Sequence, residues 1–298
     1  MHRRKFIQAI CGPFLDLETS FSLKGFFLSF GCSNFNYYES ATKTNHDFRA
    51  FYFLSKTLAS FENLGNVFFF GTNPRLEVPL LNVRLRKSFL AFPSAKYYSL
   101  GLAIDNLNYP VKSLGNSMSS MLKFFEGKLP LNFIIFLSEY SNLNFLSLSA
   151  VKKTHFFLGS SLLSRLDLQT CLNGFFCVLR TLELNLSSLN VVSKFLGRLS
   201  AFETGNLPSV RSSKGPFKHR NFLFLCGVDF EGSKLSDFQL KNFTVYQGSF
   251  YINNFVQYLN LILPSCAFTE KFSSFLNLEG RLRFTQKAVA PFKSAFSD

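Results

Sequence analysis

The chain has 298 residues, 47% of them hydrophobic, which is enough apolar material to bury the core of one large or two modest α/β lobes. Its 32 lysine and arginine residues against 18 aspartate and glutamate residues give a net charge of +14. This charge suits an acidic protein neighbour, an anionic membrane surface or nucleic acid, although no RNA-binding signature is present. The six cysteines include no C-x-x-C pair, which argues against zinc-ribbon and ferredoxin-type sites. An uncharged run, 243–269, is interrupted by asparagine, glutamine and proline, so no transmembrane helix is predicted.

The first predicted element is a strand over residues 5–11, which ends at the Gly12-Pro13 turn. Asp16 is a suitable N-cap for a helix that we expect to reach about Phe30. Two further segments are predicted before the next strand: an irregular loop over 31–47 and a helix over 48–64.

A short apolar run, 67–70, has the composition of a buried strand. Gly71 and Pro74 end it, and Glu77 then lies in the first turn of a predicted helix whose last turns are basic. That charge order is the one the helix dipole favours. The pattern therefore predicts a strand, a tight turn and a helix, which is half of a βαβ unit. Two elements are expected to follow, a strand around 97–104 and a capped helix ending at Gly127.

The second half repeats the strand–turn–helix pattern. Residues 154–158 are apolar, Gly159-Ser160-Ser161 form a turn, and a helix is expected over about 166–182. Such a turn can hold phosphate, but the usual G-x-G-x-x-G pattern is missing, so nucleotide binding is disfavoured. His155, at the start of the strand, is interpreted as structural and is assigned no ligand. The remaining predicted elements are a helix over 191–202, an exposed loop over 205–218 and strands over 222–229 and 243–248.

Residues 71–87 read GTNPRLEVPLLNVRLRK. This run resembles, without gaps, the GTNPR-x-E-x-P-x-x-N-x-R-x-R-K segment of the largest peripheral-arm subunit of respiratory complex I, NADH:ubiquinone oxidoreductase. That subunit has an iron–sulfur N-terminal part and a C-terminal domain related to molybdopterin oxidoreductases. The blocks that match it in order lie at Gly71, Gly115, Gly159, Gly227–Gly248 and Leu263–Arg281. A turn with Gly12, Asp16 and Glu18 matches more loosely.

The resemblance implies an α/β fold with two Rossmann-like lobes and mostly parallel sheets, as in molybdopterin oxidoreductases. We expect the first lobe at residues 1–150 and the second at 151–298, the latter ending in the LP…EGR loop. Both lobes would belong to one molybdopterin oxidoreductase-like domain.

The resemblance also implies a role: a structural subunit of the peripheral, matrix-side arm of complex I that supports electron transfer from NADH to ubiquinone and is non-catalytic by itself. The family's cluster-binding part is absent from this sequence, so iron–sulfur clusters are expected on a separate partner chain, beside other peripheral-arm subunits. No cofactor is expected on this chain. The implied location is the mitochondrial inner membrane, reached only through the complex, and the 41 phenylalanines suggest an AT-rich organellar gene. The alternatives are a molybdopterin-dependent oxidoreductase and an organellar RNA-binding protein; nucleic acid is not expected as a partner.

No catalytic residue and no metal ligand is predicted. In active members of the superfamily the C-terminal loop approaches the pterin. A vestige of that cleft would involve six residues: Gly71, Asn73, Glu270, Asn277, Glu279 and Arg281. Glu270 and Glu279 could act as an acid–base pair. We favour a structural role, in which they fix the loop through hydrogen bonds and through pairing with Arg281. Cys266 lies in the same segment, at a position that varies in the family, and is assigned no metal.

Overall fold

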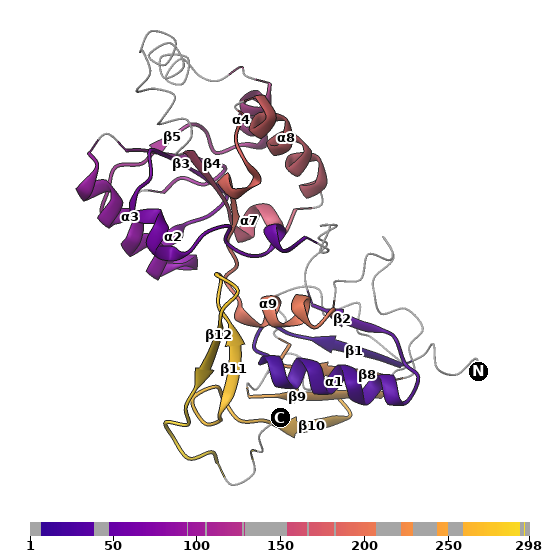
Figure 1. Ribbon diagram of the computed structural model, residues 1–298. Coiled ribbons are helices and arrows are strands. Elements are labelled where there is room, and N and C mark those ends of the chain that lie inside the picture. The colour runs from indigo at the N-terminus through magenta and orange to yellow at the C-terminus, as the bar shows by residue number, and fades with distance from the viewer. Residues whose placement is uncertain are drawn as a thin grey trace. The chain divides into compact units, whose positions relative to one another are not determined.

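The chain folds into two compact units. The computed structural model describes residues 7–38, 48–93, 95–104, 106–126, 128, 154–165, 167–181, 183–206, 222–228, 243–249, 259–292 and 295 (Figure 1). Unit one is discontinuous and joins Met1–Ser40 to Phe195–Asp298, whereas unit two is the continuous segment Ala41–Lys194. Each unit holds one five-stranded parallel sheet, so the predicted α/β class with mostly parallel sheets is confirmed.

This division differs from the boundary expected at residue 150, and strand pairing explains why. Strand β6 (Thr154–Leu158) pairs along its whole length with β3 (Asn66–Phe70), which keeps it in unit two. Strand β1 (Ile7–Cys11) pairs instead with β8 (Phe222–Cys226), far along the chain. A single cut at one position cannot separate sheets whose strands are interleaved in this way.

Unit two is organised around β3 and β6, whose ten positions are all buried. Apart from Asn66, Thr154 and His155 their residues are apolar, which is the composition of strands covered on both faces of a sheet. The strand order is β5-β4-β3-β6-β7, and every neighbouring pair is parallel. The other strands are β4 (Lys96–Leu100), β5 (Lys112–Ser113) and β7 (Leu189–Val191). The helical elements are η2 (Arg49–Phe51), η3 (Leu58–Glu62), α2 (Pro74–Glu77), α3 (Pro79–Ala91), α4 (Met118–Phe125), α7 (Ser160–Leu163), α8 (Leu168–Thr181) and η4 (Leu186–Ser188).

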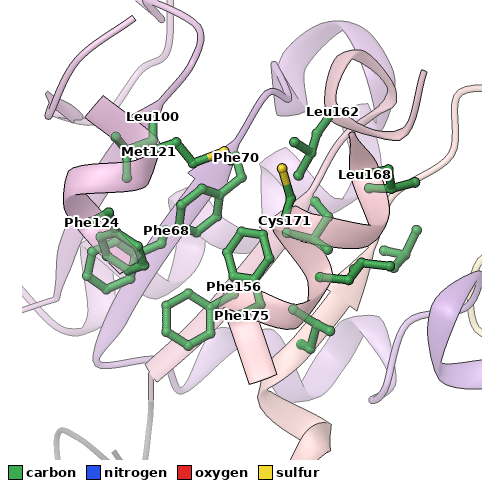
Figure 2. Close-up of a cluster of buried hydrophobic side chains, with 14 of the residues drawn as sticks. Phe68, Phe70, Leu100, Met121, Phe124, Phe156, Leu162, Leu168, Cys171 and Phe175 are labelled. Atoms are coloured by element: carbon green, nitrogen blue, oxygen red, sulfur yellow. The ribbon is translucent and has the colours of Figure 1, made fainter. Parts of the chain in front are cut away.

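One face of this sheet carries an apolar core of leucine and phenylalanine side chains (Figure 2). Phe70 on β3 and Phe156 on β6 meet Phe124 from α4 and Phe175 from α8. The ring centroids of Phe70 and Phe175 lie 4.5 Å apart at an interplanar angle of 81°. This edge-to-face geometry is favourable for aromatic pairs. The abundant phenylalanines therefore fill the space between the sheet and its helices.

Unit one has a second parallel sheet, in the order β10-β9-β8-β1-β2. Its remaining strands are β2 (Phe35–Tyr37), β9 (Phe243–Gly248) and β10 (Leu261–Pro264), and its helices are α1 (Leu17–Ser29) and α9 (Leu196–Glu203). A separate antiparallel hairpin, β11 (Ser273–Leu276) with β12 (Leu282–Thr285), follows the sheet (Figure 1). Strand β11 packs against both α1 and α9, which ties the C-terminal segment to the start of the chain.

Several local expectations are confirmed. Asp16 is the N-cap of α1, where its Oδ1 accepts a hydrogen bond of 2.8 Å from the Thr19 N–H. The strands expected at 5–11, 222–229 and 243–248 are present as β1, β8 and β9, and the helix expected at 166–182 is α8. The strand expected at 97–104 is β4, which ends at Leu100.

Two predicted helices are wrong in whole or in part. Over 48–64 the structure has only the short turns η2 and η3, because Ser55 bonds outside the segment: its N–H and its hydroxyl both donate to Asn190 Oδ1. The helix predicted over 191–202 begins only at Leu196, because Val191 pairs with Leu158 in strand β7. In both places a tertiary hydrogen-bond partner overrides local helix propensity.

The loop expected over 31–47 contains the short strand β2. Residues 39–47 of that loop, most of the loop expected over 205–218, and the helix end expected at Gly127 lie outside the described residues. Within the described part of the chain, no helix combines the length and the apolar character needed to cross a membrane.

Candidate functional site

The sheet of unit two has a switch point, the place where the order of strand addition reverses. The chain builds outward from β3 through β4 to β5, then returns to place β6 on the other side of β3. In doubly wound sheets, ligands bind in the crevice outside the carboxyl ends of the two strands at this point. Here those ends carry Gly71-Thr72-Asn73 after β3 and Gly159-Ser160-Ser161 after β6. The fold therefore brings two of the matched sequence blocks together at the usual ligand position.

The chain fills this position with its own carboxylate. Glu77 Oε2 accepts a hydrogen bond of 3.1 Å from the N–H of Ser160, the first residue of α7. Its other oxygen accepts a bond of 3.4 Å from the Asn73 N–H. The first N–H groups of a helix have no partner inside the helix, which is why phosphates bind there in nucleotide-binding folds. Glu77 takes one of these donors and supplies the anion from within the chain.

The two loops also touch directly. The Ser161 hydroxyl donates to the Gly71 carbonyl oxygen. A Cβ atom on Gly159 would lie 2.1 Å from Thr72 Cβ and 2.6 Å from the Gly71 carbonyl oxygen, closer than atoms can approach. Gly159 is therefore required by close packing of the loops, and no ligand atom fits between them at this point.

The remaining polar residues of the GTNPR block hold the loop that follows β4. Asn73 Oδ1 caps α2 by accepting from the Arg75 N–H at 3.1 Å, and Asn73 Nδ2 donates to Asn106 Oδ1 at 3.2 Å. The Arg75 guanidinium donates to the Asn106 carbonyl oxygen. Further along, Asn82 Oδ1 accepts from the Tyr109 hydroxyl at 2.9 Å. The loop surrounds a shallow, open hollow of about 490 Å³, lined by Ile104, Leu107, Asn108, Tyr109, Pro110 and Val111.

The basic end of the same block has a local partner. Arg84 and Lys87 on α3 both contact the carboxylate of Glu62 on η3, the lysine at 2.7 Å. Hydrogen bonds from Lys87 and then Arg84 lower the pKa of Glu62. Two of the positive charges that the sequence places here thus join two elements of unit two.

Unit one has its own switch point, between β1 and β8, and it is closed by backbone. A Cβ atom on Gly12 would lie 1.9 Å from the Gly227 carbonyl oxygen and 2.4 Å from Val228 Cα. The N–H of Gly197, near the start of α9, donates to the Pro13 carbonyl oxygen at 3.1 Å. The loop after β1 is therefore packed against the loop after β8 and against α9.

Two acidic residues beside this turn reach the C-terminal segment. Asp16 Oδ2 and Lys271 Nζ are 2.7 Å apart, and their side chains are only 4% and 6% exposed. Glu18 accepts from both the N–H of Ser274, at 3.0 Å, and its hydroxyl. Glu18 and Ser274 are 256 positions apart in the sequence. The sequence alone predicts no role for Lys271 or Ser274, because no local pattern can pair residues so distant.

The C-terminal candidates form a self-contained turn. Asn277 Oδ1 accepts from the N–H groups of Glu279 and Arg281, at 3.1 and 2.8 Å. Glu279 Oε2 lies 3.3 Å from Arg281 Nε. Glu270 Oε2 accepts from the Ala267 N–H at 3.0 Å. The predicted hydrogen bonds and the pairing of Glu279 with Arg281 are confirmed. The six candidate residues fall into two groups: Gly71 and Asn73 lie in unit two and the other four in unit one.

His155 and Cys11 are buried, and each lies beside polar side chains. His155 Nδ1 and Nε2 lie 3.3 Å from Asn190 Nδ2 and Lys56 Nζ, respectively. Burial, with a smaller contribution from Lys56, lowers the pKa of His155 to about 4. Burial raises the pKa of the Cys11 thiol to about 12, which opposes the thiolate that binds metals. Among the described residues, no three histidine, cysteine, aspartate or glutamate side chains gather as metal ligands would.

These observations decide the fit of a phosphate-bearing cofactor. At one switch point the Ser160 N–H already donates its hydrogen bond to Glu77. At the other, backbone atoms fill the position. The residues at neither switch point fit such a group.

Comparison with known proteins gives sequence relatives that include three oxidoreductase subunits. The chain is 28% identical to the NADH-ubiquinone oxidoreductase 75 kDa subunit of Reclinomonas americana, covering 95% of this chain and 41% of that protein. It is 27% identical to NADH dehydrogenase [ubiquinone] iron-sulfur protein 1 of Solanum tuberosum, covering 98% and 37%. It is 26% identical to the mitochondrial NADH-ubiquinone oxidoreductase 78 kDa subunit of Candida albicans, covering 96% and 37%. The chain thus spans about two fifths of the length of these relatives.

A solved structure supports the fold and the family profile supports the assignment. The structure is the formyltransferase/hydrolase complex of Methylorubrum extorquens with methylofuran, which matches with a TM-score of 0.55 at 10% identity, covering 93% of this chain and 85% of that one. At that identity the likeness concerns the fold alone. The family profile described as Molybdopterin oxidoreductase matches residues 1–298. The chain therefore belongs to the molybdopterin oxidoreductase family.

Proposed function

We propose that this chain is a structural subunit of the peripheral arm of respiratory complex I, NADH:ubiquinone oxidoreductase. In this role it supports electron transfer from NADH to ubiquinone and holds no redox centre of its own. The names of its sequence relatives, which are NADH dehydrogenase or NADH-ubiquinone oxidoreductase subunits, support the assignment to complex I.

The observation that carries the non-catalytic part of the proposal is the bond from the Ser160 N–H to Glu77. A pterin cofactor carries phosphate, and the family fold would offer that phosphate the helix N–H groups at a switch point. In this chain the Glu77 carboxylate lies where the phosphate would bind. It accepts hydrogen bonds from Ser160 on one loop and from Asn73 on the other. We therefore propose that the chain binds no pterin and no metal.

The partners are proposed on the same basis. Relatives named as iron–sulfur or 75 kDa subunits are much longer than this chain, so the iron–sulfur clusters are proposed to lie outside residues 1–298, and other peripheral-arm subunits are proposed to pack beside this chain. The proposed location is the matrix side of the mitochondrial inner membrane, reached through the complex. The abundance of phenylalanine supports an AT-rich, organellar gene.

The test is purification of the native assembly in mild detergent through a tag on this chain. Mass spectrometry identifies the partners, and metal analysis is made on this chain after separation. We expect NADH-oxidising and quinone-reducing subunits in the assembly, and neither molybdenum nor iron on this chain. A free chain that carries molybdenum would overturn the proposal and favour a molybdopterin-dependent oxidoreductase.

A further inference from the structure

The C-terminal hairpin has two outer edges, and the chain covers only one of them within its described residues. On the β11 side, Glu18 accepts from the outward N–H of Ser274 and also from its hydroxyl. On the β12 side, none of the described residues pairs with the strand, since β12 belongs to a two-stranded sheet. An uncovered edge offers N–H and C=O groups to any strand that can align with it.

The hydrogen-bond register identifies which residues form the open edge. Asn277 N–H donates to the Arg281 carbonyl oxygen, so this pair is hydrogen-bonded across the hairpin. In antiparallel strands, hydrogen-bonded and non-hydrogen-bonded pairs alternate. The Leu276–Leu282 and Ser274–Phe284 pairs are then the non-bonded ones. The Ser274 N–H donates to Glu18 and not to β12, as expected for a residue of a non-bonded pair. The backbone groups of Leu282 and Phe284 therefore face away from β11.

The side chains at this edge are apolar and exposed. Leu282 is 44% exposed and Phe284 is 76% exposed. Proteins usually protect an edge strand with charged side chains or by covering it. The one charged residue between Leu282 and Phe284 is Arg283, whose side chain is also exposed. Two exposed apolar side chains on the residues whose backbone groups face outward are, in contrast, the features of a surface that pairs with another strand.

The charges around the edge select the partner. From residue 279 to residue 287 the chain has three cations, Arg281, Arg283 and Lys287, and one carboxylate, Glu279. Glu279 is engaged by Asn277 and Arg281 within the turn. The edge thus presents a net positive charge beside its apolar side chains, on a chain whose overall charge is +14.

We propose that the outer edge of β12 docks an extended segment of a partner chain that alternates acidic and apolar residues. The segment pairs its backbone with Leu282 and Phe284, places apolar side chains against theirs, and turns carboxylates toward Arg281 and Arg283. The register and exposure of the hairpin carry this inference independently of the proposed function.

Hydrogen exchange on the full-length chain tests the pairing. The probe is an alternating Glu-Val peptide of about eight residues, a common strand length, and a Lys-Val peptide of equal length is its control. The Glu-Val peptide is expected to protect the amides of Leu282 and Phe284 and to leave that of Arg283 unchanged, because Arg283 already bonds to β11. Absence of this alternation overturns the proposal. Protection that appears without peptide and rises with protein concentration also overturns it, because the occupant is then a second copy.

Binding of fluorescent peptides to variants tests the groups involved. Phe284→Pro removes an outward N–H without removing a bond to β11, whereas Phe284→Thr keeps the N–H and removes the ring. We expect at least about tenfold weaker binding for Phe284→Pro and for Arg283→Glu, and a smaller loss for Phe284→Thr. Circular dichroism and thermal unfolding check that the variants fold. Equal binding of the Glu-Val and Lys-Val peptides, or equal loss in both Phe284 variants, contradicts strand pairing.

Discussion

The carboxylates that lie beside the two switch points differ in the kind of partner they have. In unit two, Glu77 accepts hydrogen bonds from uncharged backbone N–H groups. In unit one, beside a closure made by backbone, two buried opposite charges, on Asp16 and Lys271, meet at 2.7 Å. A buried charge that loses its partner has neither water nor a counter-charge. The Asp16–Lys271 ion pair in unit one should therefore tolerate substitution far less well than the Glu77 hydrogen bonds in unit two.

The largest effect is expected from Lys271→Met, which leaves the buried Asp16 carboxylate without its cation. We expect a loss of roughly 3–5 kcal/mol in the free energy of unfolding. Urea unfolding measures this loss, and hydrogen exchange of the amides in β11 shows whether it is local to the hairpin. The control is Lys271→Met with Asp16→Asn, since asparagine still caps α1 and removes the lone charge. If the single variant is as stable as the double variant, the ion pair does not hold the hairpin.

Acid should act on unit two through His155. The pKa of this group is about 4 in the folded chain and 6.5 in its ordinary state. Between those values the unfolded chain binds the extra proton, so stability present above pH 6.5 is lost as the pH falls towards 4. The loss amounts to roughly 3 kcal/mol. It is measured as the difference in unfolding free energy between the wild type and His155→Gln from pH 7 to pH 4. Parallel curves for the two proteins would show that His155 titrates normally.

The hydrogen bond from Ser160 to Glu77 in unit two should stabilise the fold less than the Asp16–Lys271 ion pair in unit one. Glu77→Ala leaves the Ser160 N–H without its acceptor, and we expect a loss of about 1–3 kcal/mol. Glu77→Gln keeps an oxygen acceptor and should lose less. Hydrogen exchange at Ser160 reports the bond directly. A loss as large as that of Lys271→Met would remove the proposed contrast between the two units.

The smallest effect is expected at the exposed ion pairs. Glu62→Gln removes the partner of Arg84 and Lys87, but exposed pairs contribute little because water and salt screen them. At physiological salt we therefore expect a change in thermal midpoint close to experimental error. A marked, salt-sensitive shift would mean that charge holds η3 against α3.

Sequence predicts the parts of this protein whose causes are local. The apolar runs of β3 and β6 and the cap at Asp16 depend on neighbouring residues, and each is present in the structure. The segment at 48–64 fails because its decisive contact, from Ser55 to Asn190, lies outside the segment. Propensity is a weak guide wherever such a distant partner competes with helix formation.

The candidate site shows the same limit. The GTNPR and Gly159-Ser160-Ser161 blocks are visible in the sequence, but the bond from Ser160 to Glu77 that joins them is not. For the C-terminal turn, the expected hydrogen bonds of Glu279 and Glu270 are within reach of sequence reasoning because their partners lie within a few residues. The links from Asp16 and Glu18 to the hairpin are not, because they join opposite ends of the chain.

The discontinuity of unit one has a consequence for synthesis on the ribosome. Strand β1 emerges early, but its neighbour β8 begins only at Phe222, and the hairpin that binds α1 emerges later still. At usual elongation rates the wait is on the order of ten seconds or more. Meanwhile all of unit two emerges and is free to fold. The nascent chain therefore holds β1 with only its β2 neighbour available during that time, so unit one completes its sheet after unit two can fold.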